Sequence, residues 1–90
     1  MMQKVEIIIS GNVQGVGFRY RTLMLAKELG VKGKVWNNDD GTVGILAQAD
    51  MQTMYNFQKR LREGNRWIRV NYMDVQPASF PDFTDFSISH

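Results

Sequence analysis

Three glycines and an arginine lie close together in the segment G-N-V-Q-G-V-G-F-R, residues 11–19. Glycine has no side chain, so backbone amides beside it can approach a ligand closely, and the free N–H groups that open a helix attract anions. Arg19 adds a permanent cation whose planar guanidinium can pair with two phosphate oxygens. We therefore expect a site for a small phosphorylated molecule, although a flexible connector with a solvated arginine would have the same composition.

This glycine segment does not match the nucleotide-binding loops. Tyr20 stands where the third glycine of a dinucleotide fingerprint belongs. The lysine and hydroxyl residue with which a P-loop holds nucleotide phosphates and magnesium are missing after the glycines. The phosphorylated ligand is therefore not predicted to be a nucleotide held in either of these two ways.

Asn37 is the second candidate for a functional role, because the end of its strand can lie beside the glycine segment in a split sandwich. Asparagine has no titrating proton at neutral pH, but its amide can hold a water molecule in a fixed direction. It could equally be an ordinary turn residue. We expect Asp39 and Asp40 to favour the turn that follows, and we assign no role to His90, which we expect in solvent.

The chain lacks the groups that hydrolysis of a phosphate monoester normally requires, namely metals, a strong nucleophile or a general acid. It has no cysteine and one histidine, so we expect no metal site and no cofactor. A mixed anhydride of a carboxylic acid and phosphate is easier to cleave. Its leaving group is a carboxylate, which needs no proton because the pKa of a carboxylic acid is about 4. Amides and a guanidinium would then suffice to stabilise the transition state while water attacks.

The segments around these residues have the patterns of strands and helices in regular order. Alternation predicts strands, helical spacing predicts helices, and Gly30, Asp50 and Gly64 are suitable helix ends. The expected elements are a strand at 5–10, a helix at 18–29, strands at 33–37 and 42–48, a helix at 51–63, a strand at 67–76 and an edge strand at 83–88. This order predicts an α+β ferredoxin-like split βαβ sandwich, βαββαβ plus a short edge strand, with two helices on one face of an antiparallel sheet.

The composition limits the organisation of the chain. Ninety residues, 43% of them hydrophobic, suffice for one core, so we expect residues 1–90 to form a single domain. A net charge of +2 is too small to indicate nucleic acid by itself. Because no apolar run has the length of a signal peptide or a membrane span, we expect a soluble protein of the cytoplasm.

These residues together resemble the acylphosphatase family over nearly the whole chain. Residues 11–19 match the family pattern G-x-V-Q-G-V-x-F-R in full, and a looser second motif begins at Gly33, with Lys34 and Ala49 in place of the usual residues. By this resemblance the protein is an acylphosphatase, a hydrolase that cleaves acyl phosphates to carboxylate and inorganic phosphate. The resemblance implies no metal, no cofactor and no covalent intermediate.

The resemblance also assigns the site residues. Arg19 and Asn37 are catalytic: Arg19 binds the phosphate and Asn37 orients the attacking water. The phosphate-binding cradle consists of Arg19 and the backbone amides of the preceding loop, that is Gln14, Gly15, Val16, Gly17 and Phe18. The partner is a small-molecule acyl phosphate, and we expect a monomer that binds neither nucleic acid nor a membrane.

Two other functions stay open at this point. RNA-recognition domains share this order of elements, but the strand at 42–48 has no aromatic side chain on which bases could stack. The basic residues near the second helix are more simply explained as a solvated face. These are Lys59, Arg60, Arg62, Arg66 and Arg69. A module that senses an anion without turning it over would keep the same pocket.

Overall fold

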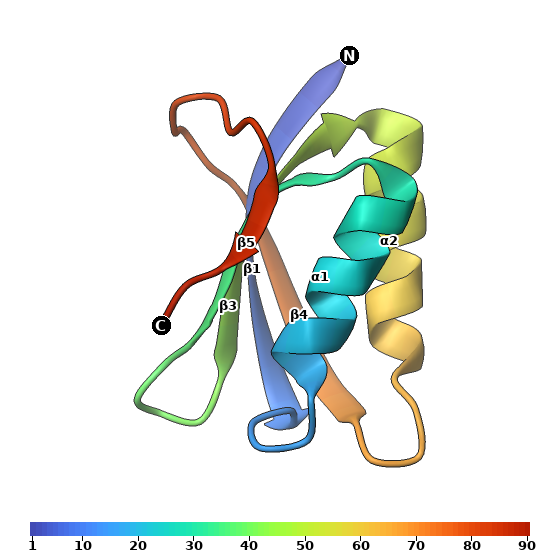
Figure 1. The fold of residues 1–90 in the computed structure, drawn as a ribbon, viewed down its shortest axis with the longest axis vertical. Coiled ribbons are helices and arrows are strands. Elements are labelled where there is room, and N and C mark those ends of the chain that lie inside the picture. Colours follow the sequence, from blue (N-terminus) through green and yellow to red (C-terminus); the bar gives the residue numbers. More distant parts are fainter.

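Five strands and two helices follow one another along the chain in the predicted order (Figure 1). In the computed structural model, which describes all of residues 1–90, the elements are β1 (Met2–Asn12), α1 (Phe18–Leu29), β2 (Lys32–Asn37), β3 (Val43–Asp50), α2 (Met51–Glu63), β4 (Arg69–Pro77) and β5 (Phe86–Ile88). The predicted elements are all present, with bounds that differ by a few residues at some ends. Neither helix has the length and apolar character needed to cross a bilayer.

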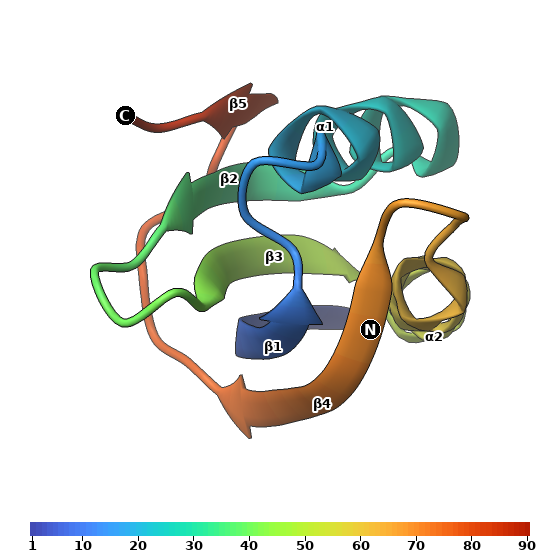
Figure 2. The same ribbon diagram turned by 90° about the horizontal axis from the view of Figure 1, so that it is seen from below.

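The strands form one sheet in the order β4-β1-β3-β2-β5. Strand β1 pairs antiparallel with β3 and β4, and β2 pairs antiparallel with β3. The sequence predicted an antiparallel sheet. The edge strand β5 instead pairs parallel with β2, so the sheet is mixed. The cause is the connection after β4, which starts at one edge of the sheet and brings the chain to the other edge (Figure 2).

Both helices cover the same face of the sheet (Figures 1 and 2). Alternation along β1 directs Ile7 and Ile9 into this layer, where both are fully buried with Ile45 of β3. Helix α2 contributes Phe57 and Leu61, which are also fully buried. One cluster of 17 buried apolar residues joins the sheet to the two helices. The predicted ferredoxin-like arrangement is thereby confirmed.

The connection between β4 and β5 passes over the other face of the sheet and contacts three strands in turn. Lys4 of β1 forms an ion pair of 2.7 Å with Asp82, and Gln48 of β3 accepts a hydrogen bond of 3.0 Å from the backbone N–H of Phe83. Lys32 of β2 then donates to the carbonyl oxygen of Thr84 at 3.2 Å. These contacts deliver β5 to the edge of β2, beside the start of α1.

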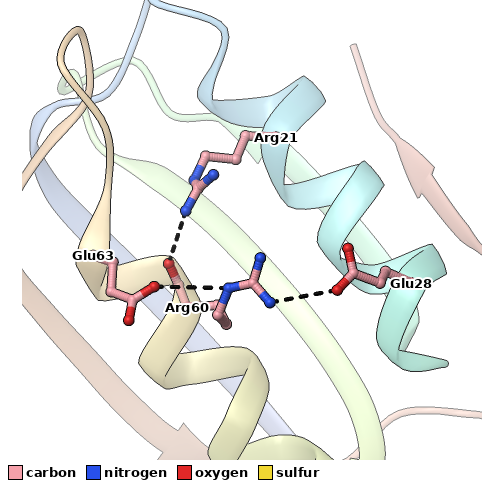
Figure 3. A network of polar contacts seen from close by, with 4 residues as sticks. All are labelled: Arg21, Glu28, Arg60 and Glu63. Atoms are coloured by element: carbon pink, nitrogen blue, oxygen red, sulfur yellow. Dashed lines mark hydrogen bonds and ion pairs between the residues drawn. The ribbon is translucent and has the colours of Figure 1, made fainter.

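Helices α1 and α2 are joined by a polar network (Figure 3). Arg21 of α1 donates to the carbonyl oxygen of Arg60 at 3.2 Å, and Arg60 lies 3.4 Å from Glu28 of α1 and 3.7 Å from Glu63. The ion pairs are largely exposed and contribute little stability on their own. The bond to Arg60 directs the side chain of Arg21 toward α2. Arg19 precedes Arg21 by two residues, so its side chain leaves α1 on the opposite side.

Candidate active site

The loop between β1 and α1 is shaped by two glycines. Gly15 has φ +75° and Gly17 has φ +82°, and no residue other than glycine has a positive φ. A Cβ atom at either position would meet nothing within 4 Å, so the backbone conformation and not a lack of room requires glycine there. Successive N–H groups in a loop of this kind can converge on an anion.

Helix α1 begins without a cap. Gly17 is its N-cap residue, no side chain bonds to the free amides, and its first turn contains no acidic residue. The first backbone hydrogen bond of the helix is donated by the N–H of Arg21 to the carbonyl oxygen of Gly17, at 3.0 Å. The N–H groups of Phe18, Arg19 and Tyr20 precede that bond, so the partial positive charge of the helix end is not neutralised by the protein itself.

A small hollow of about 180 Å³ opens at this helix end. This is below the usual range of about 300–1,000 Å³ for pockets that enclose a whole organic ligand. The residues that line it come from the loop, the first turn of α1 and the chain after β5, namely Val13, Gly15, Gly17, Phe18, Arg19, Tyr20, Ile88 and His90. No carboxylate side chain is among them, so the hollow favours a small anion.

His90 is a lining residue that the sequence analysis did not assign. It is exposed, as expected, but its Nδ1 lies 3.5 Å from Nη1 of Arg19. Strand β5 reaches this place only because it pairs with β2 across the sheet, and no local pattern around residue 90 indicates that pairing. Ile88 also lines the hollow because β5 pairs with β2, where Ile88 lies opposite Val35, and no local pattern predicted this position.

Gln14 connects the loop to the β2–β3 hairpin. Its side-chain Nε2 donates to the carbonyl oxygens of Asn38 and Thr42, both at 2.8 Å. Neither Gln14 nor Val16 lines the hollow, whereas Gly15, Gly17, Phe18 and Arg19 do. The side chain of Val16 packs instead against the apolar core. A contribution of the Gln14 and Val16 amides to phosphate binding stays a prediction.

Asn37 is the last residue of β2 and is exposed. It precedes Asn38, whose carbonyl oxygen accepts the bond from Gln14, so the end of β2 lies beside the glycine loop as predicted. Asn38 itself is fixed by a bond from Trp36 Nε1 at 2.8 Å and by its own bond to Thr42 Oγ1 at 3.0 Å. The side chain of Asn37 does not line the hollow.

The two aspartates after Asn37 belong to the turn. Asp40 accepts hydrogen bonds from the hydroxyl and the backbone N–H of Thr42, at 2.6 and 3.0 Å. These bonds, the hydroxyl bond first, hold the pKa of the Asp40 carboxyl below its ordinary value. Asp40 therefore stabilises the hairpin as an anion, which confirms the prediction that it favours the turn.

Comparison with known proteins gives a consistent result. A sequence model of the family Acylphosphatase matches residues 5–88. The chain is 45% identical over 97 aligned residues to an acylphosphatase of Lactococcus lactis subsp. lactis, covering 99% of this chain and 100% of that protein. It is 40% identical over 87 residues to an acylphosphatase of Treponema denticola, covering 97% and 93%. The crystal structure of acylphosphatase from Bacillus subtilis matches with a TM-score of 0.93 at 35% identity, covering 100% of both chains.

Proposed function

The chain belongs to the acylphosphatase family, whose members hydrolyse acyl phosphates, and we propose that the hollow at the start of α1 is where this enzyme does so. One observation carries the proposal. The uncapped N-terminus of α1 and the guanidinium of Arg19 face the same small hollow. Both favour negative charge there, where the phosphoryl end of such a substrate would bind.

In the proposed mechanism the protein stabilises charge and positions water. The amides of residues 14–19 and the Arg19 guanidinium hold the phosphoryl oxygens, where negative charge is spread in the transition state. Water attacks phosphorus opposite the carboxylate, forming one P–O bond as the bond to the carboxylate oxygen breaks. Both protons of the water stay with the phosphate product, which forms as dihydrogen phosphate, and the carboxylate leaves as an anion without a general acid.

Asn37 is proposed to orient the attacking water. Its amide group can donate to one partner and accept from the water, which fixes the water's direction without removing its proton. The exposed position of Asn37 at the end of β2, joined to the glycine loop through Asn38 and Gln14, supports this role. Neither a covalent intermediate nor a metal ion is required by these steps.

The size of the hollow also bears on the choice of substrate. A volume of about 180 Å³ is below that of pockets which enclose a whole organic ligand, so a large acyl group would extend beyond the hollow. We therefore propose that the enzyme recognises mainly the phosphoryl end and accepts acyl groups of different structure. Residues 1–90 are proposed to act as one domain and as a monomer of the cytoplasm, and light scattering after gel filtration would measure the oligomeric state.

Hydrolysis of benzoyl phosphate in the presence of a chelator tests the activity and the independence from metal. We expect turnover that the chelator does not reduce, with benzoate and phosphate formed in equal amounts. A single turnover in ¹⁸O-labelled water should place the label in phosphate and none in benzoate, because the attack is on phosphorus. Label in the carboxylate, or loss of activity with chelator, would contradict the mechanism. Arg19→Gln serves as the control for a contaminating phosphatase.

A further inference from the structure

We propose that His90 is a second anion-binding residue of the hollow, and that its protonated imidazole joins Arg19 in holding the phosphoryl group. The inference rests on the proposed function, because it concerns the same hollow. Nδ1 of His90 lies 3.5 Å from Nη1 of Arg19, and both residues line the hollow. Two basic side chains from opposite ends of the chain therefore face one anion site.

The backbone before His90 is held in place. Ile88 pairs with Val35 in the parallel ladder of β5 and β2, and the N–H of Ser89 donates to the carbonyl oxygen of Val35 at 2.8 Å. The last backbone bond is therefore only one residue away from His90. This anchoring holds the backbone of the residue whose imidazole lines the hollow.

The elements around His90 contribute one cation and no carboxylate side chain to the lining of the hollow. Helix α1 contributes the Arg19 cation and the Tyr20 phenol, and the glycine loop contributes no titratable group. On β2, the Lys34 ammonium lies over the Trp36 ring, 5.6 Å from its centroid, on the other face of the sheet. Nδ1 of His90 can accept an N–H of Arg19 only while that nitrogen carries no proton.

A bound dianion favours the protonated form of His90. Opposite charge close to an imidazole stabilises the imidazolium form, so anion binding and proton uptake by His90 favour each other. The affinity for the anion is therefore lowest at pH values well above the pKa of His90 in the complex. It increases as the pH falls through that pKa, and it becomes constant below the pKa of His90 in the free protein. Each pKa unit of difference between the two states corresponds to about a tenfold change in affinity.

The test uses inorganic sulfate as the probe, because sulfate stays a dianion throughout the range in which histidine titrates. His90 is the sole histidine of the chain, so its ring protons in an NMR spectrum need no further assignment. The α-amino group of Met1, which also titrates near neutral pH, lies at the other end of the molecule from the glycine loop (Figure 1). We expect saturating sulfate to raise the pKa of His90 by about one unit, and sulfate to bind about tenfold more tightly at about pH 5 than at about pH 8.

Variants separate charge from structure. His90→Gln keeps an acceptor for Arg19 but no proton, and should lose the pH dependence of sulfate binding. His90→Lys should bind sulfate tightly throughout the range. Lys27→Gln removes a cation from the far end of α1 and should behave like the unchanged protein. Equal pH dependence in His90→Gln, or an imidazole pKa that sulfate does not move, would overturn the role of His90 alone. Failure of sulfate to bind at any pH would overturn the proposed phosphate site as well.

Discussion

Nε2 of Gln14 lies 2.8 Å from the carbonyl oxygen of Thr42, across 28 residues of sequence. A second bond of 2.8 Å from the same nitrogen reaches the carbonyl oxygen of Asn38, so both amide protons are used. These bonds join the loop that precedes Arg19 to the base of the hairpin that carries Asn37. The relative position of the two proposed catalytic residues therefore depends on a side chain that does not line the hollow.

Gln14→Glu is expected to loosen this connection. A carboxylate cannot donate to the two carbonyl oxygens and would face them with its own negative charge, so the free energy of unfolding should fall by about 1–3 kcal/mol. Turnover should fall as well, because Asn37 is no longer held beside the loop. Urea denaturation and steady-state kinetics measure the two effects. Gln52→Glu is the matched control, since the side chain of Gln52 is exposed and bonds only to Asn56 one helical turn away. Unchanged stability in Gln14→Glu would refute the structural role.

Replacement of Arg19 tests charge stabilisation in the transition state. Arg19→Gln should lower kcat by about 10²- to 10³-fold, the usual effect of losing one such donor. Arg19→Lys should recover only part of this, because an ammonium is a point charge without the forked geometry of the guanidinium. Arg21→Gln is the control, since Arg21 points toward α2 (Figure 3) and should alter stability more than kcat. Full activity in Arg19→Lys would show that charge alone is sufficient.

Asn37→Ala separates water positioning from anion binding. If Asn37 orients water, kcat should fall by about 10²-fold while the dissociation constant for sulfate stays nearly constant. Stability should change little because the side chain is exposed. Asn38→Ala provides the contrast: it removes bonds to Trp36 and Thr42 and should lower the melting temperature. Parallel losses of sulfate binding and kcat in Asn37→Ala would instead indicate that Asn37 binds the anion.

The parts of the site that the sequence predicted are local ones. The glycine spacing in residues 11–19 indicates a loop, a helix start and an anion site because backbone conformation depends on neighbouring residues. The position of Asn37 beside the loop followed from the order of elements. His90 and the two acceptors of Gln14 were not predictable in this way. They depend on strand pairing and side-chain directions between segments 24 to 71 residues apart in the chain.

Gly17→Ala and Gly41→Ala form a matched pair. Both glycines have positive φ, +82° and +91°, and a Cβ at either would meet nothing within 4 Å. Each substitution should therefore cost about 1–2 kcal/mol of stability through backbone strain alone. Only Gly17 lines the hollow, so only Gly17→Ala should also weaken sulfate binding and lower kcat. Equal activity in the two variants would mean that the loop conformation at Gly17 does not shape the anion site.

Asp50 should make part of the stability dependent on pH. Its carboxylate caps α2, accepting from the N–H of Thr53 at 2.8 Å, and this bond holds the pKa of Asp50 below its ordinary value of 3.8. A lowered folded-state pKa means that the stabilisation is complete above the pKa of the unfolded chain and is lost as the pH falls through the folded value. The melting temperature of Asp50→Ala should therefore be well below that of the unchanged protein at neutral pH, and this difference should narrow below about pH 4.

Asp50→Asn keeps an uncharged acceptor, and its melting temperature should lie between those of Asp50→Ala and the unchanged protein. A gap between Asp50→Ala and the unchanged protein that stays constant from neutral to acidic pH would show that the charge of Asp50 contributes nothing to the cap.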